Sequence, residues 1–184
     1  VMAYNFQPFK SASEATVAWM QKEYASLRTG MTTPTILDSV QVDVYGSKMP
    51  INQVASVLGE GPRSLRITPW DKTVTKSIDS AIREANLGLS VSVDDQGLRI
   101  SFPELTSDSR ALLLKTAKQK LEEARIRVRT EREKIHVDLD KQEKDGKVSK
   151  DDAFRGKTEL QKLVEEANRK LEELLVKKEK EIQE

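Results

Sequence analysis

The sequence predicts an α+β protein in which an elongated antiparallel three-helix bundle carries a small inserted α+β domain. Three segments of the 184-residue chain space their apolar residues in heptads, which is typical of amphipathic helices that pack together. Between them, residues 31–105 include stretches that alternate apolar and polar side chains, as strands do. Charged residues make up 33% of the chain and hydrophobic residues 37%, a balance that favours long helices over a thick globular core.

The first helical segment carries a capping-box pattern at Ser11 and Glu14. Its apolar stripe consists of Phe6, Phe9, Val17, Met20, Tyr24 and Leu27. The steps of three and four residues within this stripe place these side chains on one helical face, which we expect to pack against the other helices.

The second and third segments span about residues 107–144 and 150–183. Asp145-Gly146 breaks the chain between them, and Ser149 with Asp152 is placed to cap the third helix. The expected seams are Leu114, Ala117, Leu121, Ala124, Val128 and Ile135, then Leu160, Val164, Ala167, Leu171 and Leu174. Helices of this length extend roughly 50–60 Å. Because each has one apolar seam and is otherwise charged, the three are expected to be stable only as a bundle.

Residues 31–105 show the pattern of a small α+β domain. Strands are expected at residues 40–44, which end in a turn at Tyr45-Gly46, and around Leu65 and Ile67. A short helix capped by Asp71 or Thr73 and ended by Gly88 comes next, and a hairpin about the turn 94–97 completes the domain. The expected buried face of that helix is Val74, Ile78, Ile82 and Ala85.

The predicted bundle therefore comprises residues 1–29 and 106–184, and the inserted domain comprises residues 31–104. Linkers are expected near 29–34 and 103–106, where Gly, Thr and Pro interrupt the apolar periodicity. Two short linkers side by side permit a hinge, because only a few backbone torsions need to change.

Charge is the most informative functional signal. Between Arg110 and Lys134 there are nine basic and four acidic residues, a local net charge of +5, whereas residues 31–105 have a net charge of −2. Arg125, Arg129 and Arg132 are spaced i, i+4 and i+7 on one helical face, and Lys118 continues that line one heptad earlier. Such a ridge suits a nucleic-acid backbone. The alternative is a solvated face whose arginines pair with neighbouring glutamates.

Other site classes find no support in the sequence. The chain has no cysteine, which excludes disulfides and thiolate metal sites and suits a reducing compartment, and no apolar run approaches the ~20 residues of a membrane helix. We therefore expect a cytoplasmic protein without membrane contact, and no catalytic residue, metal or cofactor. His136 lacks a catalytic constellation, and residues 94–97 are better explained as a turn than as a calcium loop. Trp19 and Trp70 are expected to be packing residues.

Several motifs, in order and with the expected spacing, resemble those of ribosome recycling factors. They are Leu27 to Gly30, Pro34, Leu37-Asp38, Tyr45-Gly46, Pro50 to Val57, Ala85 to Leu89, and Ala124 to Arg129. The resemblance implies an L-shaped, non-enzymatic monomer with dimensions similar to transfer RNA. It would bind ribosomal RNA of the large subunit after termination and, with elongation factor G and GTP, separate the subunits.

The resemblance also implies residue roles. Arg110, Arg129 and Arg132 would be the principal RNA contacts, joined by Lys118 and by Arg28 and Arg125, which can alternatively support the linker or the bundle. The hinge would involve Thr29, Gly30, Pro34, Pro103, Leu105 and Thr106. Three positions depart from the family pattern and lower the positive charge, namely Met31, Ser109 and Glu133, while Arg127 restores part of it.

A helical protein-binding adaptor or chaperone is the alternative function. Its binding would depend little on salt, whereas RNA binding weakens steeply as the salt concentration rises.

Overall fold

The computed structural model describes residues 4–29 and 33–184, and the chain divides into two compact units. One unit is Val1–Tyr24 with Leu114–Lys180, and the other is Ala25–Leu113 with Glu181–Glu184. The expected domain ranges, 1–29 with 106–184 and 31–104, stay predictions beside this division. In the described part of the chain, no helix is long and apolar enough to cross a membrane.

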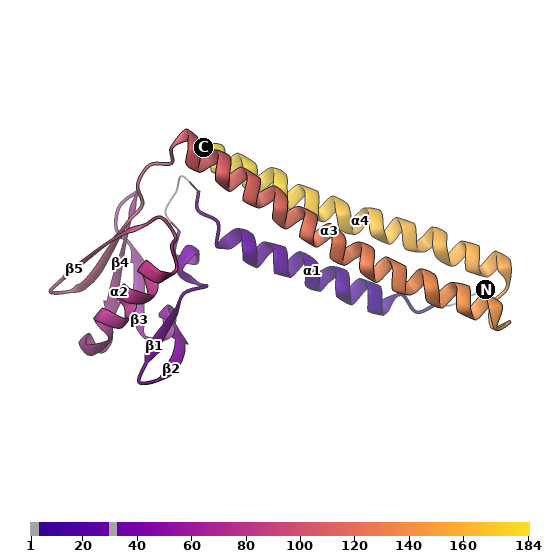
Figure 1. Ribbon diagram of the computed structural model, residues 1–184, viewed down its shortest axis with the longest axis horizontal. Helices are drawn as coiled ribbons and strands as arrows, with labels where there is room; N and C mark the ends of the chain where they lie inside the picture. The colour runs from indigo at the N-terminus through magenta and orange to yellow at the C-terminus, as the bar shows by residue number, and fades with distance from the viewer. Residues whose placement is uncertain (1–3, 30–32) are drawn as a thin grey trace. The chain divides into compact units, whose positions relative to one another are not determined.

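The first unit contains most of three long helices: α1 (Gln7–Ala25), α3 (Ser107–Lys144) and α4 (Lys150–Gln183) (Figure 1). The start of α3, as far as Leu113, and the end of α4, from Glu181, belong to the second unit. The Tyr4 hydroxyl donates to Asp138 near the end of α3, and the Tyr24 hydroxyl donates to the Ala117 carbonyl near its start. Helix α1 therefore runs antiparallel to α3. Ion pairs join α3 to α4 at Arg125–Glu172 and Asp140–Lys157. Helices α3 and α4 are therefore antiparallel as well. The predicted three-helix bundle is confirmed.

The buried seams follow the predicted heptads with small shifts. Leu114 and Leu174 are only half-buried, and Leu175 and Leu139 are buried instead. A strict heptad places the position after Leu171 three residues on, but an α-helix turns every 3.6 residues, and here a step of four residues reaches the core. The buried residues are Phe9, Thr16, Met20 and Tyr24 of α1, Ala117, Leu121, Ala124, Val128, Ile135 and Leu139 of α3, and Ala153, Leu160, Val164, Ala167, Leu171, Leu175, Lys178 and Ile182 of α4.

The helix starts show which capping predictions were right. The Ser149 hydroxyl accepts a hydrogen bond from the Asp152 amide at 3.0 Å, which confirms the cap of α4. The capping box at Ser11 is wrong, because α1 already begins at Gln7, whose amide donates to the Asn5 side chain. Ser11 is therefore an interior helical residue. Between α3 and α4, Gly146 adopts a φ of +72°, so the predicted break is a left-handed turn.

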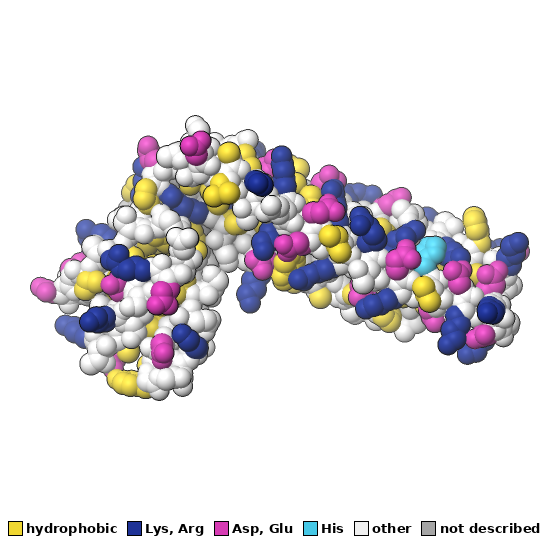
Figure 2. Space-filling view, in the orientation of Figure 1, with side chains coloured by type: hydrophobic (Ala, Val, Ile, Leu, Met, Phe, Trp, Pro, Cys, Tyr) yellow, Lys and Arg dark blue, Asp and Glu magenta, His cyan; other side chains and the backbone are white. Residues whose placement is uncertain are grey.

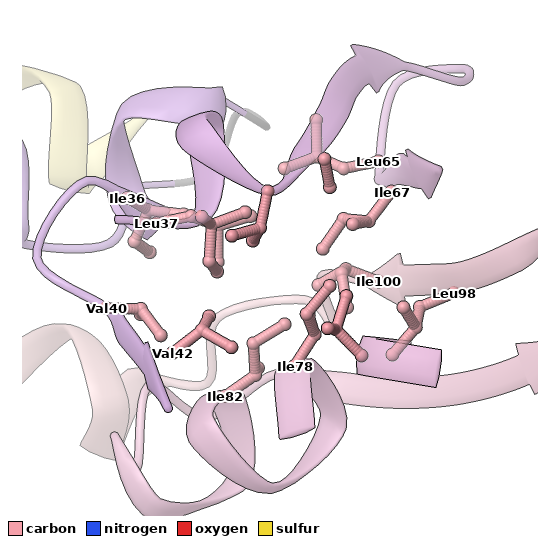
Figure 3. Packing of buried hydrophobic residues seen from close by; sticks show 14 of the residues in the cluster. Ile36, Leu37, Val40, Val42, Leu65, Ile67, Ile78, Ile82, Leu98 and Ile100 are labelled. Atoms are coloured by element: carbon pink, nitrogen blue, oxygen red, sulfur yellow. The ribbon is translucent and has the colours of Figure 1, made fainter. Parts of the chain in front are cut away.

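The second unit contains a four-stranded antiparallel sheet in the order β3-β4-β6-β5. Its strands are β3 (Ala55–Gly59), β4 (Ser64–Pro69), β5 (Ser90–Asp94) and β6 (Gly97–Ser101). A separate hairpin, β1 (Gln41–Val44) with β2 (Ser47–Pro50), and helix α2 (Thr75–Glu84) complete the unit with short 3₁₀ turns at Pro34–Leu37, Ile51–Gln53 and Lys72–Val74. Figure 3 shows side chains of the sheet, of β1 and of α2 meeting in one apolar core.

Most elements of this unit match the sequence expectations. The strand around Val42, the strand around Ile67 and the β5–β6 hairpin are confirmed, and Tyr45 and Gly46 both adopt positive φ as a tight hairpin turn requires. Strands β2 and β3 were not predicted. Strand β3 is an edge strand, and its burial falls off along its length from Ala55 to Gly59, so no clear alternation marks it.

The predictions for helix α2 and for Trp70 were partly wrong. Asp71 caps the 3₁₀ turn that leads into α2, and Val74, Ile78 and Ile82 are buried as expected, but Ala85 is exposed. The helix ends at Glu84, and Asn86, with a φ of +52°, leaves the helical region before Gly88 is reached. Trp70 is 68% exposed and is therefore not a core residue.

Candidate nucleic-acid interface

Three arginines of α3 line one surface depression at the boundary with α4. Arg125, Arg129 and Arg132 surround a volume of about 360 Å³ whose other walls include Gln161 and Asn168 of α4. Their spacing of four and three residues places them on the flank of α3 that faces α4, since an α-helix turns by about 100° per residue. The structure thus brings together three of the six predicted RNA contacts.

Neighbouring glutamates neutralise part of this charge. Arg125 pairs with Glu172 at 3.2 Å, and Arg132 pairs with Glu133 at 2.8 Å, so two of the arginines are held by carboxylates. Arg129 is exposed and forms no ion pair with any described residue. The predicted alternative, a paired and solvated face, therefore describes Arg125 and Arg132 in the unbound protein. Arg129 provides the uncompensated charge.

Lys118 lies on the same flank of α3 and is exposed, again without an ion pair to the described residues. Figure 2 shows that Lys and Arg side chains are interspersed with Asp and Glu along the helices on the face drawn. On that face, the helices show no large surface of one sign.

The remaining two predicted contacts, Arg28 and Arg110, belong to the second unit. The guanidinium of Arg28 lies 5.9 Å from the centre of the Phe102 ring, and its buried Nε has no hydrogen-bond partner among the described residues. Burial lowers the pKa of Arg28, and the nearby charge of Arg63 lowers it further. The Nε of Arg110 is likewise buried and has no hydrogen-bond partner within residues 4–29 and 33–184. The six candidates therefore fall into two groups.

The Glu104 carboxylate lies near Arg63 and Arg110 of the second unit. Glu104 accepts a hydrogen bond from Arg63 at 2.6 Å, and this bond, together with the charges of Arg63 and Arg110, lowers the pKa of Glu104. Arg63 thus binds Glu104 directly, and Arg110 acts on it through its charge.

The predicted hinge residues have defined local roles where they are described. Thr106 caps α3, its hydroxyl accepting from the Ser109 amide at 3.0 Å, and Pro34 opens a 3₁₀ turn. Thr29 and Leu105 are buried, and Pro103 is exposed. Gly30 lies outside the described residues, as does Met31. The hinge itself stays a prediction.

Sequence reasoning did not foresee one contact on α3. The Arg127 guanidinium stacks on Trp19 of α1, 3.8 Å from the centre of its ring, and Lys120 approaches the same ring at 5.8 Å. Trp19 is half-buried between the helices, as a packing residue would be, and it also orients a cation. The pair is far apart in sequence, so no local pattern indicates it.

Two other kinds of site considered in the sequence are a metal site and a calcium loop. Among the described residues, no group of His, Asp and Glu side chains is arranged to hold a metal ion. Asp94 accepts hydrogen bonds from the amides of Gln96 and Gly97 and pairs with Arg66, which confirms that residues 94–97 form a turn.

A family model for ribosome recycling factors matches residues 20–182, which is most of the chain. The chain belongs to the ribosome recycling factor family. This result confirms the resemblance inferred from the motifs.

Individual ribosome recycling factors support the assignment. The chain is 40% identical over 173 residues to that of Sinorhizobium fredii, covering 94% of this chain and 93% of the relative. It is 41% identical over 171 residues to that of Oleidesulfovibrio alaskensis, covering 93% of each protein, and 39% identical over 178 residues to that of Chlorobaculum parvum, covering 97% and 96%.

Solved structures agree with the fold. A solution structure of a ribosome recycling factor matches with a TM-score of 0.77 at 30% identity, covering 97% of this chain and 95% of the other. A second match, with a TM-score of 0.65 at 34% identity and 96% coverage of each chain, is the T. thermophilus recycling factor. That protein was placed, with E. coli elongation factor G, on the E. coli post-termination complex.

Proposed function

We propose that this ribosome recycling factor acts as a monomer in the cytoplasm and binds the post-termination ribosome through large-subunit ribosomal RNA. With elongation factor G and GTP, it would promote dissociation of the ribosome into subunits without itself hydrolysing anything. The observation that carries the RNA contact is the depression between α3 and α4 lined by Arg125, Arg129 and Arg132. The related factor placed on a post-termination complex with elongation factor G supports the choice of partners.

The mechanism is mechanical. Three continuous apolar seams make the bundle stiff, so that it can act as a lever anchored on RNA. Phosphates would bind Arg129 directly and would compete with Glu172 and Glu133 for Arg125 and Arg132. Arg28 and Arg110 would supply further contacts from the second unit, and Lys118 would extend the bundle contact along α3. Elongation factor G would then move the α+β unit about the linkers near 29–34 and 103–106.

The test is co-sedimentation of the protein with vacant large ribosomal subunits across a salt series. The unmodified protein should bind tightly at low salt and lose affinity steeply as salt rises. Arg132→Glu should weaken binding at least tenfold, because it removes one phosphate contact and places a carboxylate in the arginine depression. Its fold should be preserved, since the side chain is at the surface and its ion pair is exposed.

Arg169→Glu is the matched control. Arg169 is an exposed residue of α4 that does not line the arginine depression, and the substitution changes the net charge by the same amount. It should bind much more tightly than Arg132→Glu. Salt-insensitive binding, or equal affinities for the two variants, would refute the RNA-anchored mechanism and favour a protein-binding adaptor.

A further inference from the structure

The Arg127 side chain is exposed and is held by an aromatic ring instead of a carboxylate. Its guanidinium carbon lies 3.8 Å from the centre of the Trp19 ring. Its N–H groups form no hydrogen bond or ion pair with any residue in the described part of the chain. A stacked guanidinium keeps its donors in the plane of the group, directed away from the ring, so they remain available to an anion.

Lys120 makes an instructive comparison because it lies one heptad before Arg127, beside the same ring. Its ammonium group is 3.7 Å from Glu23 and 3.9 Å from Glu123, so its charge is already compensated. Arg127 therefore provides the free positive charge on this flank of α3. Its orientation is fixed before any partner arrives, which reduces the conformational entropy lost on binding.

Arg127 and Arg129 point to nearly opposite flanks of the helix. Each residue turns an α-helix by about 100°, so a separation of two residues corresponds to about 200°. Arg129 faces the boundary with α4, whereas Arg127 faces Trp19 of α1. The exposed crest of α3 between them carries Ile126, which is 48% exposed. Ile126 shares this crest with Glu122 and Thr130, which lie one turn to either side of it. On each side of the crest is one arginine that forms no ion pair with the described residues.

We infer that large-subunit RNA crosses the crest of α3 at Ile126 and is bound on both flanks, with Arg127 as a second phosphate-binding residue oriented by Trp19. Opposite charge identifies the partner, because each unpaired guanidinium presents several donors that suit a phosphate. Ile126 would contact the apolar faces of ribose or base. This inference rests on the proposed function and extends its RNA contact from one flank of the helix to two.

The experiment compares Arg127→Ala with Arg169→Ala in the same sedimentation assay with vacant large subunits. Both substitutions remove one exposed positive charge from the bundle. Arg127→Ala should weaken binding about tenfold and reduce the slope of log affinity against log salt by about 0.7 to 0.9, the change expected for one lost phosphate contact. Arg169→Ala should leave the slope unchanged.

The Trp19→Leu variant tests the orientation of Arg127 separately from its charge. It preserves Arg127 but removes the stacking surface, so it should lower the affinity several-fold while the salt slope stays close to that of the unmodified protein. Urea unfolding of each variant shows whether the bundle remains folded under the assay conditions. Arg127→Lys should retain the slope, because it keeps the charge, which distinguishes a phosphate contact from a purely structural cation–π pair.

The failures of the two proposals are distinguishable. If Arg132→Glu loses binding while Arg127→Ala binds with unchanged affinity and slope, RNA lies on the α4 flank only and this inference is wrong. If the unmodified protein shows no salt-dependent binding at all, the proposed function fails and this inference fails with it.

Discussion

At the scale of single residues, Gly97 has no room for a side chain. It begins β6 with a φ of +139°, and a Cβ added there would lie 2.2 Å from the Ile67 carbonyl oxygen and 2.9 Å from Cδ of Pro69. Both obstacles belong to β4, the central neighbour of β6 in the sheet. A side chain at this position would therefore displace the strand that carries much of the core.

We expect Gly97→Ala to lower the free energy of unfolding of the α+β unit by about 2 kcal/mol or more, because backbone strain and a backbone clash act together. Gly59→Ala is the control, since nothing lies within 4 Å of a Cβ at Gly59 and its φ is not positive. Urea unfolding would show a large shift for the first variant and a small one for the second. Equal midpoints would contradict this description of the β4–β6 contact.

The arginines of α3 differ in their neighbours, although they have the same charge. Arg125, Arg129 and Arg132 lie on one helical face, yet Arg125 and Arg132 pair with glutamates, whereas Arg129 has no ion pair in the described part of the chain. Arg127 has the same charge but a different neighbour, Trp19. The contribution of each arginine to RNA binding therefore depends on its partners in the folded protein as well as on its position along the helix.

At the scale of elements, two tyrosines near the ends of α1 fasten that helix to α3. The Tyr24 hydroxyl donates to the Ala117 carbonyl at 2.7 Å, and burial, with the charge of Glu179, raises the pKa of Tyr24 to about 12. Burial and the hydrogen bond to Asp138 also raise the pKa of Tyr4. Both tyrosine side chains thus stabilise the folded protein when they are protonated.

The direction of the pH effect follows from these shifts. An unfolded tyrosine ionises near pH 10, below the pKa of about 12 that Tyr24 has in the bundle. Its contribution to stability is therefore complete below pH ~10 and is lost as the pH rises toward 12. The unfolded chain releases its proton first in that window, so alkaline pH shifts the equilibrium toward unfolding.

We expect Tyr24→Phe to lower the free energy of unfolding by about 1 kcal/mol at pH 7, the value of one hydrogen bond. The difference from the unmodified protein should shrink between pH 10 and 12, where the unmodified protein loses the tyrosine contribution. Urea titrations at pH 7, 9, 10 and 11 measure both quantities. A difference that is independent of pH would show that the Tyr24 phenol does not act through its protonation.

At the scale of the whole molecule, the described part of the chain has two separate apolar cores, one in each unit. The core of the second unit is formed by residues between Ile36 and Phe102, and the bundle has its own seam. Each unit can therefore keep its internal structure if linker torsions change. This arrangement is what a mechanism based on domain movement requires.

Proline at both Thr29 and Gly30 should slow subunit splitting more than it weakens ribosome binding, because it restricts the backbone torsions of the first linker. Gly30→Pro alone is the companion variant, since the side chain of Thr29 is buried and its loss can affect stability. Light scattering of ribosomes with elongation factor G and GTP measures splitting, and sedimentation measures binding. Unchanged splitting in both variants would argue against a hinge in this linker.

The sequence alone was sufficient for features that depend on neighbours along the chain. Heptad spacing predicted the three bundle helices, the Tyr45-Gly46 dipeptide predicted a hairpin turn, and Ser149 with Asp152 predicted the cap of α4. Periodicity and turn chemistry act over a few residues and are therefore visible in sequence. The i, i+4, i+7 spacing of the arginines likewise placed them on one flank of α3.

Tertiary structure decided the features that depend on residues far apart in the chain. The position of β4 in the sheet depends on β6, which follows it in the chain by about thirty residues, Ser64 pairing with Ser101 and Ile67 with Leu98. Pairing with Glu172 restrains Arg125, and stacking on Trp19 orients Arg127. These contacts join residues tens of positions apart. They set the strand register and the effective charge of each arginine, because local spacing does not specify which distant groups meet.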